Sequence, residues 1–356
     1  MEGYHVIVVL AHDDQYPTMT PLITVMMAVF NAADFLDSAI KSIRTQSCTD
    51  FEFLIVDDGS TDTSSQIIKR NAEEDSRIIA HQLNHSGPVR ARNFALGQAR
   101  GQYVAQMDAD DISTPNRFET QIEYLDAHKE LAIVGSQVEF IDQYGKVIDR
   151  TLPLASKETL NDQLRNGTGF LCHSSAMFRR SALKRIGGYR APFAPAEDHD
   201  LYLRIADFAE LANVNSYLVK YRLHMRSLSF TRTMQQGLCM ATAVEIAHLR
   251  RQGLAEPPLP EVSITWSTAL AMGVDANKLI ELILGQYCVY IGFALRMGED
   301  RVLDRLVREL WSLPKTEAQK RQLSGILRPV MKHYITHYRP GRTLRYGLQS
   351  LYLRLK

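Results

Sequence analysis

The chain has 356 residues, 23% charged residues and a formal net charge of +1 at pH 7. This length suits one large domain with a smaller one, and a balance this close to neutral gives no support to nucleic-acid binding. The cysteines contain no C-x-x-C pair, which argues against a zinc knuckle or a disulfide framework and favours a reducing compartment. The apolar stretch near the start, Val6 to Ala11, is too short for a secretory signal, and the residues around it are too weakly basic. We therefore expect a cytoplasmic protein. The cysteines are Cys48, Cys172, Cys239 and Cys288.

Strand and helix patterns alternate through the amino-terminal half. Continuous apolar runs predict strands buried on both faces, and helical spacing or helix-start residues follow them. This order predicts an α/β fold with a mostly parallel, doubly wound sheet. Strands are expected over 22–30, 51–56, 77–80, 102–105 and 131–134, and helices over 35–43, around Ile67 and Ile68, over 88–96, and from Thr114 and Pro115 as N-cap and first residue.

Two acidic clusters come directly after predicted strands. They are Val56-Asp57-Asp58-Gly59-Ser60 and Met107-Asp108-Ala109-Asp110-Asp111. Ligands bind beyond the carboxyl ends of such strands, and clustered carboxylates favour a cation such as Mg²⁺ or Mn²⁺ whose other ligands include phosphates. The alternative for a single D-x-D is a solvated turn that caps the next helix, which is the role we expect for Asp57 and Asp62.

Further motifs place these clusters in an ordered series. The series resembles the inverting family 2 glycosyltransferases with the GT-A fold, and it covers about 21–229. The motifs are V-x-N (Val29–Asn31), V-D-D-G-S-T-D (Val56–Asp62), G-x-x-x-A-R-N (Gly87–Asn93), M-D-A-D-D (Met107–Asp111), G-G-Y (Gly187–Tyr189), E-D-x-D (Glu197–Asp200) and Y-R-x-H-x-x-S-x-S (Tyr221–Ser229).

The resemblance implies a nucleotide-sugar donor, most simply a UDP-sugar. In similar enzymes the residue at the position of Asp58 accepts a hydrogen bond from the uracil N3–H, and backbone groups around Ala28 and Phe30 hold the nucleoside. Arg92 would supply a fixed cation at the phosphates or the base.

The same resemblance implies a Mn²⁺ or Mg²⁺ cofactor. Asp110 is the expected direct ligand, and Asp108 flanks the ribose and the metal. His224, in the Tyr221–Ser229 motif, would complete the metal shell or contact the diphosphate, and an imidazole ligand suits Mn²⁺ better than Mg²⁺.

The catalytic base is expected at the start of a helix. By resemblance it is Asp198, which would take the proton of the acceptor hydroxyl. Glu197, His173 and Tyr189 are expected near the donor or acceptor sugar. His173 also fits a hydrogen-bonded core histidine, and Asp200 fits a helix cap better than a catalytic group.

A domain boundary is expected near Thr231 to Gln236. The resulting division is an extension at 1–20, a GT-A domain at 21–232 and a helical region at 233–356. No apolar run reaches the length of a membrane span, because Glu281 and Gln286 interrupt the longest run, so we expect that segment to be a core helix. Helices are expected over 241–251, 262–272, 276–297 and 301–311.

The tail at 318–356 has no Asp or Glu and alternates basic residues with tyrosines. This composition favours an anionic membrane surface, which would make the protein peripheral on the inner face; packing against the catalytic domain and RNA binding are the alternatives. The expected partners are a nucleotide-sugar and a glycan or lipid-linked acceptor, without nucleic acid. Two other functions stay open: a sugar-phosphate nucleotidyltransferase, which lacks its glycine-rich loop here, and a non-catalytic sugar-nucleotide-binding protein on the same fold.

Overall fold

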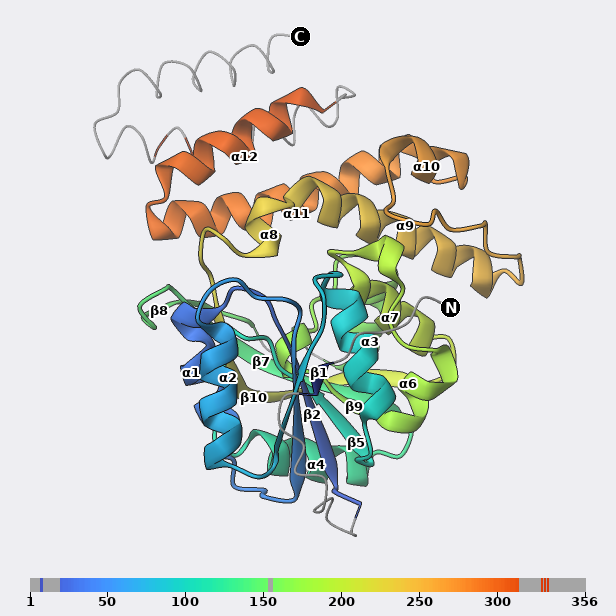
Figure 1. Cartoon of the computed structure of the whole chain (residues 1–356). Coiled ribbons are helices and arrows are strands. Elements are labelled where there is room, and N and C mark those ends of the chain that lie inside the picture. Colours follow the sequence, from blue (N-terminus) through green and yellow to red (C-terminus); the bar gives the residue numbers. More distant parts are fainter. Residues whose placement is uncertain are drawn as a thin grey trace. The chain divides into compact units, whose positions relative to one another are not determined.

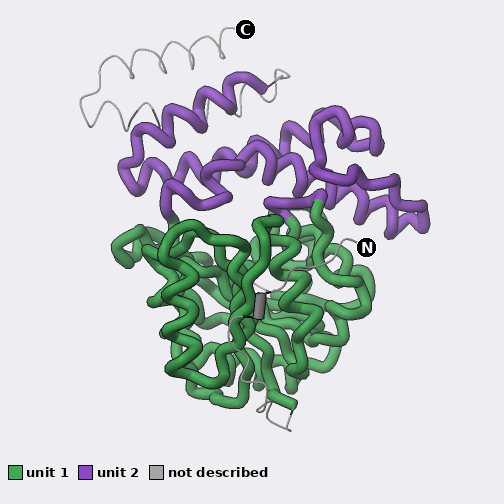
Figure 2. Tube along the Cα trace, in the orientation of Figure 1, with its two compact units in different colours: residues 1–191, 197–223 green, residues 192–196, 224–356 purple. Residues whose placement is uncertain are grey.

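The computed structural model describes residues 7–8, 20–152 and 156–313, with 328, 330 and 332. The chain forms two compact units, one of residues 1–191 and 197–223 and the other of residues 192–196 and 224–356 (Figure 2). The predictions for most of the first twenty residues and for the basic tail concern residues outside the described part of the chain.

The first unit is built on one large sheet (Figure 1). Its central strands run parallel in the order β4-β3-β2-β5, and β2 is buried along nearly its whole length, as its continuous apolar sequence requires. The predicted mostly parallel sheet is confirmed. These strands are β2 (Ile23–Val29), β3 (Phe51–Asp57), β4 (Ile78–Gln82) and β5 (Tyr103–Gln106).

Antiparallel strands extend the sheet on both sides. β9 lies antiparallel between β5 and β7, β7 runs parallel to β10, and β6 closes the edge beside β10. β1 pairs antiparallel with β4, and β8 pairs antiparallel with β7. These strands are β1 (Ile7–Val8), β6 (Ile112–Ser113), β7 (Leu131–Ile141), β8 (Val147–Arg150), β9 (Met177–Arg179) and β10 (Glu210–Arg222).

Helices cover both faces of this sheet. A hydrophobic core joins one face to α1 (Ala33–Arg44), α2 (Ser64–Glu74) and α4 (Arg117–Ala127). α3 (Pro88–Gln98) begins at its proline, as predicted, and packs on β2 and β3. The unit also contains α5 (Lys157–Arg165), α6 (Arg180–Ile186) and α7 (Glu197–Ile205).

The predicted start of α4 is wrong by two residues. Thr114 does not cap the helix, because its N–H donates to the Leu218 carbonyl at 2.9 Å and so extends the pairing of β6 with β10. Asn116 is the N-cap residue instead, and the helix begins at Arg117.

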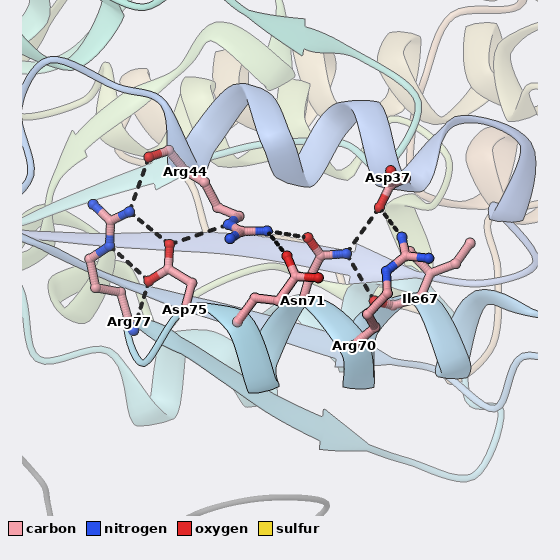
Figure 3. A network of polar contacts seen from close by, with 8 residues as sticks. Asp37, Arg44, Ile67, Arg70, Asn71, Asp75 and Arg77 are labelled. Atoms are coloured by element: carbon pink, nitrogen blue, oxygen red, sulfur yellow. Dashed lines mark hydrogen bonds and ion pairs between the residues drawn. The ribbon is translucent and has the colours of Figure 1, made fainter.

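A polar network joins α1, α2 and the start of β4 (Figure 3). Arg44 donates to Asn71 at 2.9 Å, and Arg77 donates to Asp75 at 2.7 Å and to the Arg44 carbonyl at 3.0 Å. The network lines an open depression of about 620 Å³ in which each acidic residue pairs with an arginine. Since every acidic side chain of this depression is paired and the network lies away from the acidic strand ends, we assign it to helix packing.

The second unit is helical. Its main helix, α11, packs against α9 and α12, and Gly237 permits the close approach of α9, since a Cβ there would lie 3.0 Å from the Ile283 Cα. α10 is shorter than predicted, because Thr265 forms a capping box that starts the helix at Trp266. The helices are α8 (Leu228–Thr231), α9 (Thr233–Arg251), α10 (Trp266–Ala271), α11 (Ala276–Met297) and α12 (Asp300–Ser312).

α11 has the length and mean hydropathy of a membrane-spanning helix, so the prediction that no segment reaches that length is wrong. The interrupting residues Glu281 and Gln286 are too few to bring the mean hydropathy of its most apolar 18-residue stretch below that of a membrane-spanning segment. However, 56% of its most apolar stretch is buried inside the protein, which agrees with the predicted core helix.

Candidate active site

The two acidic clusters lie at the carboxyl ends of β3 and β5, the two strands that flank β2 and run parallel to it. Asp57 accepts the Ser60 N–H at 2.9 Å, and Asp62 accepts the N–H groups of Ser64 and Ala33 at 2.9 and 3.1 Å. These contacts are the turn and cap roles predicted for Asp57 and Asp62.

Asp58 is buried and anchors the loop that leads into α3. Its carboxylate accepts the N–H groups of Ser86 at 2.9 Å and Gly87 at 2.8 Å, and the His85 Nδ1 lies 3.0 Å from its Oδ2. Phe30, just past the end of β2, is 45% exposed and its ring stacks on the His85 imidazole, with centroids 4.0 Å apart. Two of the predicted nucleoside-binding residues, Phe30 and Asp58, therefore contact the same histidine, and Ala28 lies on β2 two residues before Phe30.

Arg92 connects three parts of the site. Its guanidinium, on α3, pairs with Glu197 at the start of α7 and with Asp108 after β5, the latter at 3.1 Å. Burial lowers the pKa of Arg92, but the charges of Glu197 and Asp108 outweigh this effect and raise it above its ordinary value. Arg92 thus stays charged and holds the end of β5 beside α7.

The loop after β5 is held by hydrogen bonds to Ser174 and Arg222. The Asp108 N–H donates to the Ser174 hydroxyl at 2.8 Å. The last residue of β10, Arg222, donates its N–H to the Asp111 carboxylate and its Nε to the Asp110 carbonyl, both at 2.7 Å. Burial, followed by the charges of Asp110 and Asp108, raises the pKa of Asp111 well above its ordinary range.

Asp198 lies in the first turn of α7, where its carboxylate accepts the His199 N–H at 2.8 Å. Burial, followed by the charge of Glu197, raises the pKa of Asp198 to about 7. Asp200 is different: it is buried and pairs with Arg190 and Arg204, the latter at 2.9 Å. Its role is structural, as the helix-cap prediction indicated.

His173 is a buried, hydrogen-bonded histidine. Its Nε2 lies 2.9 Å from the Tyr189 hydroxyl, and burial, followed by the charge of Arg92, lowers its pKa to about 3. The Asn93 side chain holds the backbone of Tyr189 through two hydrogen bonds of 2.8 and 2.9 Å. His173 is therefore neutral at pH 7 and fixed beside Arg92, while its contact with a sugar stays a prediction.

His224 belongs to the second unit, whereas the acidic clusters belong to the first. Its part in metal binding stays a prediction. Sequence reasoning missed His85, Ser174 and Arg222 as site residues. Arg222 lies inside the Tyr221–Ser229 motif, Ser174 directly follows His173, and His85 lies two residues before Gly87, so each is close to a residue or motif that the sequence had indicated.

Comparison with solved structures identifies the fold. The TarS protein of S. aureus (residues 1–349, in complex with UDP) superposes with a TM-score of 0.54 at 16% identity, covering 94% of this chain and 92% of that one. The mannosyltransferase PcManGT of Pyrobaculum calidifontis, in complex with GDP-Man and Mn²⁺, gives a TM-score of 0.54 at 16% identity, covering 95% and 88%. The fold is the GT-A fold with a C-terminal helical region, as predicted.

Sequence comparison identifies the family. The model of glycosyl transferase family 2 matches residues 24–187. An uncharacterized glycosyltransferase of Methanocaldococcus jannaschii is 32% identical over 222 residues, which are 61% of this chain and 76% of that protein. The O-antigen biosynthesis glycosyltransferase WbnJ of Escherichia coli is 30% identical over 211 residues, or 58% and 81%. The chain belongs to glycosyl transferase family 2 and is a transferase enzyme, which sets aside the two alternative functions.

Proposed function

We propose that this enzyme moves a sugar from a UDP-sugar to a hydroxyl group of a glycan or lipid-linked acceptor, with inversion at the transferred carbon. The observation that supports this most is the bridge of Arg92 between Asp108 and Glu197, because it brings the acidic loop after β5 next to the residue that precedes Asp198. Donor chemistry and base chemistry then share one site.

For the donor, the exposed ring of Phe30 offers a face for a nucleobase, and Asp58 offers an acceptor for a base N–H. Backbone groups near Ala28 hold the nucleoside. The solved structures with the same fold are complexes of those proteins with UDP, UDP-GlcNAc or GDP-Man, which supports a nucleotide-sugar donor here without fixing its base.

A divalent cation, Mn²⁺ or Mg²⁺, fits the acidic loop. Burial, followed by the charges of Asp110 and Asp108, raises the pKa of Asp111, and a bound cation would offset the negative charge of this loop. We assign Asp110 as the direct ligand, with Asp108 beside it and His224 as a further candidate. The described residues contain no group of three acidic, cysteine or histidine side chains arranged to hold a metal by themselves, so phosphate and water oxygens would complete the shell. Bound metal would act as a Lewis acid on the leaving diphosphate.

Asp198 serves as the base. Its carboxylate takes the proton of the acceptor hydroxyl while that oxygen forms a bond to the anomeric carbon and the bond from this carbon to the diphosphate oxygen breaks. A pKa of about 7 suits this role, because the ionised form is available near neutral pH and still binds a proton well. Glu197, Tyr189 and His173 surround the sugar.

We also propose that the enzyme works in the cytoplasm, on an acceptor at the inner face of a membrane. The name of WbnJ, an O-antigen biosynthesis enzyme, supports a bacterial glycan acceptor. The basic, tyrosine-rich composition of 318–356 supports binding to an anionic surface.

The test is a donor panel that measures nucleoside diphosphate release, with Mn²⁺ or with EDTA. We expect one UDP-sugar to be used and the activity to disappear in EDTA. Asp110→Ala should abolish metal-dependent UDP binding in calorimetry with little change in melting temperature, whereas Glu123→Ala, an exposed residue of α4, should behave as wild type. Equal UDP affinity in EDTA and Mn²⁺ would refute the metal assignment.

A further inference from the structure

One exposed histidine is placed where the proposed function requires the donor's base. The His85 imidazole stacks on Phe30 with ring centroids 4.0 Å apart and planes inclined by 24°. Its Nδ1 lies 3.0 Å from the Asp58 Oδ2 and 3.1 Å from the Asp58 carbonyl oxygen. The imidazole therefore makes two contacts at once, a flat stack on an aromatic face and a polar contact through a ring nitrogen.

A nucleobase with an N–H at its edge would make the same two contacts. Uracil stacks through its face and donates through N3–H, and such stacking tolerates any flat ring. The Asp58 side chain is only 3% exposed, and His85 lies directly against it. The base and the imidazole cannot both use the same face of Phe30 and the same oxygen of Asp58.

We propose that His85 fills the nucleobase slot of the donor site and must leave it before a nucleotide binds, so that it sets the apparent affinity for the donor. This inference rests on the proposed function. His85 then determines donor specificity, because a nucleotide binds only if the contacts of its base are more favourable than the contacts of the imidazole that it displaces.

The surrounding loop permits this exchange. Ser86 and Gly87 bind Asp58 through their backbone N–H groups at 2.9 and 2.8 Å, so the loop stays anchored when the His85 side chain rotates away. The His85 side chain is 56% exposed, so it can rotate into solvent. Gly59, with φ of 77°, lets the loop at His85 pass close to the turn after β3, because a Cβ at this position would lie 2.9 Å from the backbone nitrogen of His85.

Occupation of the slot lowers affinity in proportion to the closed population. If His85 is closed in about nine-tenths of the molecules, the apparent Kd is about tenfold above that of the open site. Removing the imidazole should recover this factor for ligands that carry a base, and only for them.

The experiment compares His85→Ala with the wild-type full chain by calorimetry in Mn²⁺, using UDP and inorganic pyrophosphate as probes. We expect His85→Ala to bind UDP about tenfold more tightly and to bind pyrophosphate within twofold of wild type. The matched control is His128→Ala, because His128 also stacks on an aromatic ring, Tyr124, at 4.3 Å, and contacts a backbone carbonyl at the end of α4. It should change neither affinity.

Unchanged or weaker UDP binding by His85→Ala would overturn the proposal, since the imidazole would then lie outside the slot or would help to hold the base. An equal gain for UDP and pyrophosphate would also overturn it, because the effect would lie at the phosphates. If UDP bound neither to wild type nor to either variant, the proposed donor site itself would be refuted, and this inference with it. That outcome is distinct from UDP binding to wild type with no gain in His85→Ala, which overturns this inference alone.

Discussion

Replacing Asp198 by Asn separates the chemical role of this carboxylate from its structural one. The amide keeps the size of the side chain and can still accept the His199 N–H, but it cannot take a proton from the acceptor. We expect turnover to fall by about two to four orders of magnitude, the usual contribution of a positioned base, while UDP affinity stays within a few fold.

The raised pKa of Asp198 also predicts an effect on stability. Its ordinary value is 3.8 and its value in the folded protein is about 7. The folded state therefore holds the proton more tightly than the unfolded state, and stability falls as pH rises from about 4 to 7. At about 1.4 kcal/mol per pKa unit the full cost of ionisation is at most about 4 kcal/mol. Because the side chain is partly exposed, we expect about half of this, roughly 2 kcal/mol.

The measurement is urea unfolding of wild type and Asp198→Asn at pH 5 and pH 8, beside the pH dependence of kcat/KM. Asp198→Asn should gain stability over wild type at pH 8, with a smaller gain at pH 5, and wild-type kcat/KM should rise with pH and level off above about 7. A stability difference that is the same at both pH values, together with unchanged turnover, would refute the reasoning and move the base to Glu197 or Asp200.

Two other changes test the site and the tail. Arg92→Met leaves Glu197 and Asp108 without their cation, so we expect a loss of about 3–5 kcal/mol in urea unfolding, and Arg92→Lys should restore only part of it; a loss below 1 kcal/mol would contradict the bridge. Truncation near Leu327 should abolish sedimentation with anionic vesicles at low salt but not alter neutral-vesicle controls. If both forms ignore anionic vesicles, packing of the tail on the catalytic domain is favoured, and truncation should then lower the melting temperature.

The central elements could be predicted from sequence because their signals are local. β2 is buried on both faces, so its apolar run has no gaps, and Pro88 starts α3 because a proline costs no hydrogen bond at that position. The predicted bounds of α11 match the structure for a related reason: Asp275 caps one end and Gly298, with φ of 69°, closes the other.

The errors and omissions have long-range causes. Thr114 and Pro115 look like a helix start, but pairing with Leu218, about a hundred residues later, keeps Thr114 in the sheet. Arg222 fits a catalytic motif, yet its hydrogen bonds to Asp110 and Asp111 make it a support for the acidic loop, and no local pattern predicts that contact. Sequence spacing shows which residues follow a strand, but the three-dimensional fold determines which of these residues contact one another.

The pairing of charges separates supporting acids from reactive ones. Glu197, Asp108 and Asp200 each form an ion pair with an arginine, and such pairing offsets the cost of removing a carboxylate from water. Asp198 has no such ion pair among the described residues: the charge of Arg92 lowers its pKa by less than burial and Glu197 raise it. Burial and the charge of Glu197 therefore favour the protonated form of Asp198. This supports the proposed role of Asp198 as the base that takes the acceptor's proton.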